Sequence, residues 1–306
     1  LMRSSAASDV YKRQFDVNVP VGLAAILFAI FIQKEWRGAR AGSFDWPGFL
    51  CVVCFMPLLI FALARGNSPL NPEGWSSPEV IGCFAVAAAA LIVFIVRELR
   101  CENPLLNLKL LGERNFGVSM AVLAIFGIGM LGGTYLLPLY MQKGLGYTAI
   151  MAGSVFLPVG LIQGVLSTCS GFLTRYIKPL FIAVTGILVM TLSFYFASRF
   201  TLHTTHAQIM LVLYLRGFGM GLTFAPLNDF SLMNLSQRDM ASAAGISNSI
   251  KQLSGSVSIA LLTVILTGRT AFHSAQGGLS SAESYVAGIS DDFLFVTFVS
   301  LASALP

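Results

Sequence analysis

Stretches without a single charged residue recur along the whole chain, and they constrain its fold more than any other feature. They cover residues 46–64, 80–96, 115–142, 144–174, 179–198 and 252–268. Several reach the roughly 20 apolar residues that a helix needs to cross a bilayer. Only 11% of the 306 residues are charged, whereas a soluble domain has about 25%. The sequence therefore predicts an all-α, polytopic membrane protein.

Hydropathy predicts nine membrane spans. Their approximate limits are 17–33, 45–64, 79–97, 116–141, 149–172, 180–198, 207–230, 240–267 and 289–306. Connections on one side of this arrangement carry ten Lys and Arg residues, in 34–44, 97–115 and 173–179 and at Arg238. Those on the other side carry four, Arg65, Lys143, Arg199 and Arg269. The positive-inside rule places the first group in the cytoplasm and the loop 268–288 outside. The net charge of +5 thus follows from loop topology, and we expect no nucleic-acid partner.

Two basic residues, Arg216 and Lys251, lie deep within predicted spans. A charge at the centre of a membrane helix costs about 2.5–3.5 kcal/mol on insertion scales, so such residues face a bundle interior or a water-filled cavity. We expect Lys251 to line a water-filled pathway. Arg216 has two open alternatives, facing the central cavity or binding backbone carbonyls of its neighbours. The other polar candidates for a substrate pathway are Asn248, Gln252, Asn228 and Gln163.

The span 240–267 separates its residues into two faces. One face carries Ser247, Asn248, Lys251, Gln252, Ser254, Gly255 and Ser258, and the other carries Ile246, Ile250, Leu253, Val257 and Val264. The first face is predicted to meet protein or water and the second to meet lipid. For the serines we favour helix–helix hydrogen bonding, which is common between membrane helices.

Glycines recur at the four-residue spacing that lets membrane helices approach closely. The GxxxG pairs are Gly129 with Gly133, Gly160 with Gly164, and Gly217 with Gly221, and the further packing or gating candidates are Gly219, Gly171 and Arg175. Small residues at such positions allow backbone contact between helices. We predict a tight bundle whose contacts also suit the sliding of an alternating-access transporter.

No Asp or Glu is expected near the middle of a predicted span. Asp291 and Asp292 are assigned to the start of the last span, and Asp229 to the inner end of its span. Asp229 is consequently only a weak candidate for proton coupling. The chain has no HExxH, GxSxG or P-loop pattern, so we expect neither an enzyme nor a metal site.

Both ends of the chain look artificial. Residues 1–14 are polar, do not begin with Met, and resemble an adaptor-derived, non-native segment. The other end stops inside an apolar run. We therefore expect a fragment that lacks sequence at both ends.

Six stretches match one family in order and spacing. They are FDVNVPVG (15–22), FDWPG (44–48), ENPLLNLKLL (102–111), YLLPLYMQKGLGYTAIMAG (135–153), RGFGMGLTFAP (216–226) and AGISNSIKQLSGSVSIA (244–260). Together they resemble the fourteen-helix drug:proton antiporter branch of the major facilitator superfamily. In the loop GFLTRYIKP (171–179), which resembles the family's second cytoplasmic gating motif, Thr174 and Arg175 stand where the family has an acidic residue.

The resemblance implies a division of the chain and a place for the proton-coupling residue. Residues 15–33 would be the last span of the N-terminal bundle, 34–115 two linker spans with cytoplasmic loops, and 116–306 the six-helix C-terminal bundle with a truncated last span. The first five spans would be absent. In this family they contain the acidic residue that is credited with proton coupling.

The function implied by the resemblance is proton-coupled export of drugs or other amphipathic small molecules across the bacterial inner membrane. Such a transporter uses the proton gradient and no cofactor, contacts small-molecule substrate and membrane lipid, and in some relatives works with a periplasmic adaptor protein. Two alternatives stay open. One is a narrow-spectrum exporter of a metabolite or iron chelator on the same scaffold, and the other is a membrane-embedded enzyme or sensor that transports nothing.

Overall fold

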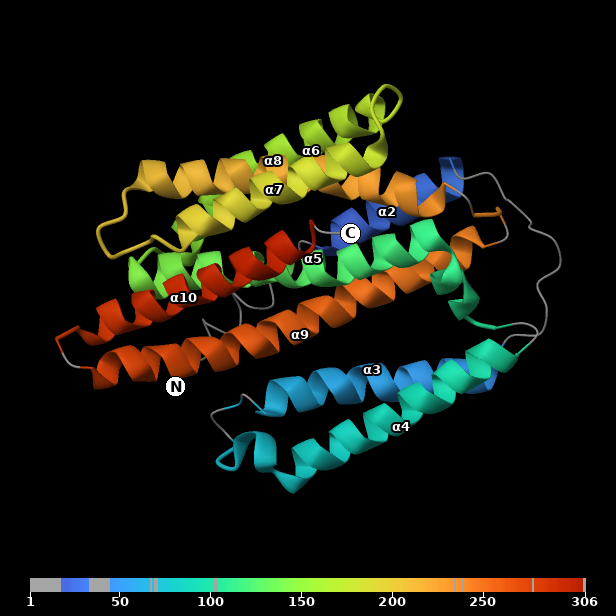
Figure 1. Cartoon of the computed structure of the whole chain (residues 1–306), viewed down its shortest axis with the longest axis horizontal. Coiled ribbons are helices and arrows are strands. Elements are labelled where there is room, and N and C mark those ends of the chain that lie inside the picture. The colour runs from blue at the N-terminus through green and yellow to red at the C-terminus, as the bar shows by residue number, and fades with distance from the viewer. Residues whose placement is uncertain are drawn as a thin grey trace. The chain divides into compact units, whose positions relative to one another are not determined.

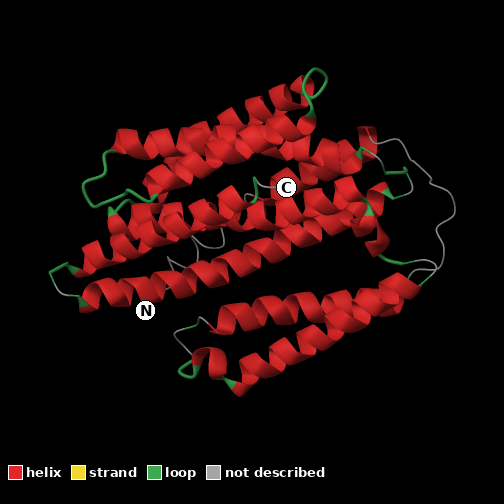
Figure 2. Cartoon of the chain, viewed as in Figure 1, coloured by secondary structure: helices red, strands yellow, loops and turns green. Residues whose placement is uncertain are grey.

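The computed structural model describes residues 18–32, 45–66, 68, 71–101, 104–233, 235–237, 239–276 and 278–304. In this part of the chain every regular element is a helix, as Figure 2 shows. The chain divides into two compact units, residues 1–44 and 45–306. The predicted adaptor segment 1–14, the loop 34–44 and Arg238 lie outside the described residues.

In the first unit the structure describes one helix, α2 (Asn18–Ile32). Its 15 residues contain no charge and its sequence is apolar almost throughout. It is the counterpart of the first predicted span, although it is shorter than the roughly 20 residues that cross a bilayer.

Among the described residues of the second unit, eight helices are long and apolar enough to cross a membrane. They are α3 (Trp46–Gly66), α4 (Pro78–Arg100), α5 (Arg114–Leu139), α6 (Ala149–Leu173), α7 (Pro179–Ala197), α8 (His206–Leu232), α9 (Met240–Ala275) and α10 (Ser281–Ala302). Short 3₁₀ turns occur at Gly74–Ser76 and Leu108–Gly112, and a π-helical turn, Tyr140–Gly144, extends α5. The prediction of an all-α, polytopic membrane protein is confirmed.

Local sequence explains where several of these helices begin. Pro78 and Pro179 occupy the first positions of α4 and α7, where a missing N–H costs nothing. Thr148 caps α6 with its hydroxyl, and Thr205 and Ser280 form capping boxes with Gln208 and Glu283 at the starts of α8 and α10.

Two predicted span limits are wrong. The helix predicted at 240–267 continues as α9 to Ala275, and the helix predicted at 289–306 begins as α10 at Ser281. The capping box of Ser280 and Glu283 starts α10 well before its continuous apolar run. Hydropathy alone detects the apolar run and not the polar first turns.

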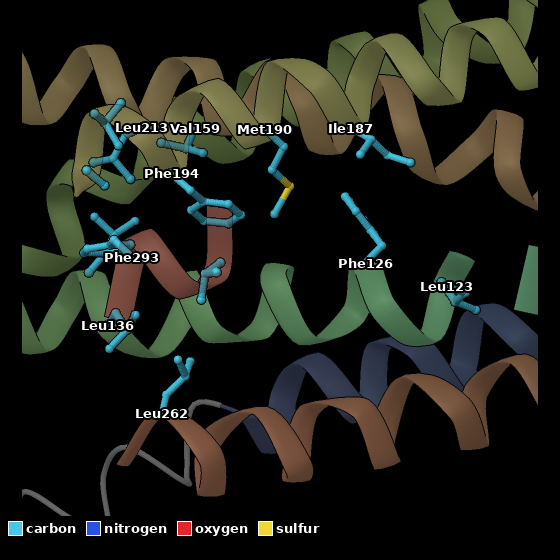
Figure 3. Packing of buried hydrophobic residues seen from close by; sticks show 14 of the residues in the cluster. Leu123, Phe126, Leu136, Val159, Ile187, Met190, Phe194, Leu213, Leu262 and Phe293 are labelled. Atoms are coloured by element: carbon cyan, nitrogen blue, oxygen red, sulfur yellow. The ribbon is translucent and has the colours of Figure 1, made fainter. Parts of the chain in front are cut away.

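Helix α5 lies inside the bundle formed by α5 to α10 and packs against α8, α9 and α10 (Figure 1). Leu123, Phe126 and Leu136 of α5 belong to one apolar cluster with residues of the neighbouring helices, several of which Figure 3 labels. Phe194 of α7 and Phe293 of α10 stack there, with their ring centroids 6.5 Å apart. This core fixes the helices that carry the polar residues described next.

Candidate functional site

Arg216 is buried in the middle of α8, with 3% of its surface exposed. Its Nη2 donates a hydrogen bond to the carbonyl oxygen of Met130 at 3.0 Å and another to the hydroxyl of Thr134, both on α5. Thr134 itself donates to the same Met130 carbonyl at 2.9 Å. The guanidinium therefore links α8 to the backbone of α5. Of the two alternatives for Arg216, facing the central cavity or binding a neighbouring backbone carbonyl, the structure shows the bond to a carbonyl.

Lys251 of α9 is half-buried beside an aromatic pair. Its Nζ lies 5.5 Å from the ring centroid of Phe224 on α8, within the range of a cation–π interaction. Phe224 in turn makes an edge-to-face contact with Phe126 of α5, at a centroid distance of 6.1 Å. In the described residues no carboxylate lies within salt-bridge distance of Lys251. An aromatic face, rather than a counter-ion, stabilises this ammonium group.

Two of the predicted pathway residues, Lys251 and Asn228, line the same small pocket. The other residues of its wall are Met120, Leu123, Phe224, Leu227, Ser231 and Ser247. Three helices, α5, α8 and α9, supply this wall. The pocket thus combines a cation, an amide and two hydroxyls with an apolar and aromatic surface, and its volume of about 20 Å³ has room for about one water molecule.

A second, more open groove lies between α5 and α9, and Gln252 faces it. Leu131, Thr134, Tyr135, Gly255, Ser256 and Ile259 complete its lining. Because Thr134 also binds Arg216, this groove borders the link between α8 and α5. The structure brings neither Asn248, which is exposed on α9, nor Gln163, which is half-buried on α6, to the walls of these two pockets.

The serines of α9 pack against α5, as the sequence predicts. Ser258 donates its hydroxyl to the carbonyl oxygen of Ile128 at 2.7 Å, and Ser247 contacts the Met120 sulfur at 3.4 Å. The assignment of Ile246 to the lipid face is wrong, because Ile246 is 3% exposed and belongs to the core. A helix packed on α5 along its length buries part of the neighbouring aliphatic stripe as well.

The three alternating glycines of α8 contact two different helices. A Cβ at Gly217 would lie 3.1 Å from the Val159 carbonyl of α6, and one at Gly221 would lie 2.7 Å from Leu166 Cβ. On the opposite side, a Cβ at Gly219 would lie 2.7 Å from Met190 Cβ of α7. The alternation lets α8 approach α6 and α7 at backbone distance at the same time.

Gly129 and Gly133 of α5 face the aromatic core. A Cβ at Gly129 would lie 3.6 Å from Phe194 and from Val296, and one at Gly133 would overlap the Phe194 ring. The pair therefore has the packing position that its spacing predicts. Sequence reasoning missed Gly186 of α7, where a Cβ would lie 2.8 Å from the Gly219 carbonyl oxygen of α8.

Gly160, Gly164 and Gly171 of α6, predicted as packing or gating residues, have no close helix contact within the described residues. A Cβ at any of the three would meet no described atom within 4 Å. The residues of α6 that approach Gly217 and Gly221 are Val159, Ile162, Gln163, Leu166 and Ser167. The three glycines lie on a different face of the helix, turned away from α8.

The loop after α6 lies beside the end of α8. Thr174 donates a hydrogen bond to the carboxylate of Asp229 at 3.4 Å, so a carboxylate from α8 lies next to the threonine of this loop. Arg175 is exposed and sits over the ring of Phe172 at 5.4 Å. Asp229 is exposed as well, as expected for a charge near the end of a span.

A cluster of charged residues lies where the start of α3 meets the end of α4. The carboxylate of Asp45 accepts a hydrogen bond from the Gly48 backbone N–H at 3.1 Å and forms an ion pair with Arg97 at 2.8 Å. Burial alone would raise the pKa of Asp45, but the Gly48 N–H and the Arg97 guanidinium outweigh it and lower that pKa below the ordinary 3.8. Glu98, 1% exposed, accepts from the Leu106 backbone N–H at 3.2 Å.

Asp292 does not lie near the end of a span, contrary to the expectation from sequence. It occupies the middle of the 22-residue helix α10 and is fully buried. Neither of its carboxylate oxygens has a hydrogen-bond partner among the described residues. The Ser-x-x-Glu pattern at Ser280–Glu283 was the sequence signal for the true start of α10.

The described residues contain no group of three or more His, Cys, Asp and Glu side chains that could hold a metal ion. Helices that contact each other through glycines, and polar residues that line narrow pockets between them, are typical of membrane transporters. A sequence profile of the Major Facilitator Superfamily matches residues 17–259. The chain belongs to the Major Facilitator Superfamily. The family predicted from the six sequence stretches is thereby confirmed.

Its relatives in this superfamily include drug exporters. The chain is 32% identical over 259 residues to the uncharacterized MFS-type transporter YhcA of Bacillus subtilis, covering 84% of this chain and 48% of that protein. It is 30% identical over 268 residues to the multidrug export protein EmrB of Haemophilus influenzae (86% and 51%). It is 28% identical over 275 residues to the puromycin resistance protein pur8 of Streptomyces alboniger (87% and 53%). The chain thus spans about half the length of these relatives.

Proposed function

We propose that this chain is part of a proton-coupled exporter of drugs or other amphipathic small molecules. The observation that carries the proposal is the similarity, over more than four fifths of the chain, to proteins named for multidrug export and for puromycin resistance. Membership in a superfamily of transporters favours transport over the enzyme or sensor alternative.

The wall of the Lys251 pocket would suit a broad range of substrates in a conformation that widens it, since the pocket here has room for about one water molecule. Its wall is mainly apolar and includes Phe224, while Asn228, Ser231 and Ser247 offer a few hydrogen bonds. Such a surface binds many amphipathic molecules moderately rather than one molecule tightly. We propose that Lys251, Asn228 and Gln252 contact substrate along the pathway, and that Asn248 and Gln163 contribute in other conformations of the transporter.

Arg216 has a different part in this proposal. Its charge is already bound by oxygen atoms of α5, so it would hold α8 on α5 rather than bind an anionic substrate. The narrow-spectrum alternative, with an anionic metabolite as substrate, would consequently depend on Lys251.

The surroundings of the protein follow from the same proposal. The exporter would be a multi-pass protein of the bacterial inner membrane, in contact with lipid and driven by the proton gradient without a cofactor. A periplasmic adaptor protein would be a further partner. Two helix bundles would rock about a site near the midplane, with drug and proton occupying it in turn.

Drug accumulation in cells tests the proposal. The natural polypeptide that contains these residues is expressed in bacteria that lack their own exporters, and the retention of puromycin and of a fluorescent lipophilic cation is measured. We expect lower retention than in cells with an empty vector, and we expect a protonophore to abolish the difference. Equal retention in both cell types, or a difference that persists after the proton gradient collapses, would contradict the proposal.

A further inference from the structure

Three polar side chains on α9 and α10 have buried oxygen atoms without hydrogen-bond partners among the described residues. They are Ser284 and Asp292 of α10 and Thr270 of α9. Most buried polar groups in proteins are hydrogen-bonded, so an unpaired one calls for an explanation such as bound water or a role in proton chemistry. Three of them on one helix–helix contact indicate a common cause.

These side chains form a row because of their helical spacing. Ser284, Gly288 and Asp292 are separated by four residues each, which places them on one face of α10. The Thr270 hydroxyl lies opposite the middle position, since a Cβ at Gly288 would come within 2.6 Å of it. Glycine at 288 therefore leaves room for that hydroxyl between Ser284 and Asp292.

Apolar residues surround the inner end of this row. One turn before Asp292, a Cβ at Gly288 would lie 3.3 Å from the Leu266 side chain of α9. One turn after it, Val296 packs against Gly132 of α5 together with Leu262. A carboxylate that is ionised in such surroundings pays a large desolvation penalty unless a cation or several donors compensate it.

No cation compensates Asp292 among the described residues. The neighbouring Asp291 pairs with Arg269 of α9 at 2.6 Å and with the His273 ring of α9 at 2.8 Å. Lys143 lies over the ring of Tyr285, at 5.7 Å from its centroid. The remaining titratable groups on the helices that pack against α10 are Lys251 of α9, which lies over the Phe224 ring, Arg114 at the first position of α5, and Tyr135, Tyr140 and Tyr195. Protonation is thus the available way for Asp292 to lose its charge.

We propose that Asp292 is a membrane-buried, proton-binding carboxyl group, and that its proton reaches it from the external end of α10 past the hydroxyls of Ser284 and Thr270. In each cycle one O–H bond forms on a carboxylate oxygen of Asp292, and its proton later returns to water through the same hydroxyls or to the opposite side. The external direction follows from the positive-inside orientation, which places the loop before α10 outside. Proton binding by Asp292 does not depend on the function proposed above, whereas the coupling of that proton to drug export rests on it.

Infrared spectroscopy of the natural polypeptide in lipid tests proton binding directly. The carbonyl stretching band of a protonated carboxyl is followed as the pH is raised. We expect a band that disappears at high pH, is lost in Asp292→Asn, shifts in Asp292→Glu, and is unchanged in the control Asp291→Asn. A spectrum that is identical in the protein and in both Asp292 variants would overturn the proposal.

Hydrogen–deuterium exchange of the same band tests the route. We expect the exchange to slow in Thr270→Val and in Ser284→Ala while the band itself remains. An unchanged exchange rate in both variants would overturn the external path.

Transport assays separate this inference from the proposed function. Asp292→Asn is expected to lose drug accumulation driven by a pH gradient and to retain drug counterflow, which needs no net proton movement. Proton-driven export without the Asp292 band would refute the inference alone. The band without any proton-driven export would refute the proposed function and leave Asp292 as a proton-binding group without coupling.

Discussion

Replacing Gly219 by alanine tests the backbone contact between α8 and α7. The added Cβ would lie 2.7 Å from Met190 Cβ, 2.8 Å from the Gly186 carbonyl oxygen and 2.9 Å from the Met190 backbone nitrogen. Two of these three atoms belong to the backbone of α7, so a rotamer change cannot relieve the overlap. Helices α7 and α8 would have to separate along the contact that Gly186 and Gly219 share.

The expected cost follows from two opposing effects. Overpacking a well-packed interior costs about 1–3 kcal/mol, whereas alanine in place of glycine inside a helix gains about 0.5–1 kcal/mol. We expect Gly219→Ala to lower the free energy of unfolding by about 0–2.5 kcal/mol relative to the parent, and by about 1–3 kcal/mol relative to a glycine-to-alanine change that creates no overlap. Reversible unfolding in mixed detergent micelles, followed by helical circular dichroism, measures this difference.

Gly164→Ala on α6 is the matched control. A Cβ at Gly164 would meet no described atom within 4 Å, so this variant should be as stable as the parent or slightly more stable. If Gly219→Ala proved as stable as Gly164→Ala, the close approach of α8 to α7 would be refuted.

Two further predictions concern the charged groups of the structure. Arg216→Met should lower the free energy of unfolding by about 1.5–3 kcal/mol, which is the range for hydrogen bonds to a charged group. Arg216→Lys should lower it by less. If the Met variant were as stable as the parent in the same unfolding assay, the link from α8 to α5 would be contradicted. Because the folded-state pKa of Asp45 is lowered, the stability from its contacts with Gly48 and Arg97 is fully present above pH 3.8 and is lost as the pH falls through the folded-state value. Unfolding followed between neutral and acid pH checks this, and an unchanged acid dependence in Asp45→Asn would refute it.

The membrane helices were predictable because bilayer crossing is a local property. A charge-free run such as 179–198 is nearly coextensive with α7, and the proline at its start marks the first turn. The packing of Gly217 and Gly221 was also predictable, since small residues four apart favour close helix contact.

Which surface a stripe of small residues contacts is not a local property. Gly160 and Gly164 have the same spacing as Gly217 and Gly221, yet a Cβ on either would meet no described atom within 4 Å. Spacing shows that close approach is possible and does not identify the partner. The same limit applies to Asp45 and Arg97, whose ion pair joins residues 52 positions apart.

The burial of Asp292 was missed for a different reason. A hydropathy reading starts the last span at the first long apolar stretch, which puts Asp292 at its edge, whereas the helix begins at Ser281. A reading that gave weight to the capping box at Ser280 and Glu283 would have placed the carboxyl inside the membrane.

Drug movement in proteoliposomes, driven by an imposed pH gradient, tests the central claim most directly. The natural polypeptide that contains this chain is reconstituted alone, without ATP, and both drug and proton fluxes are recorded. We predict that drug accumulates against its own gradient only while the pH gradient lasts, and that protons move in the opposite direction. Accumulation that is independent of the pH gradient, or drug movement without proton flux, would contradict proton-coupled export.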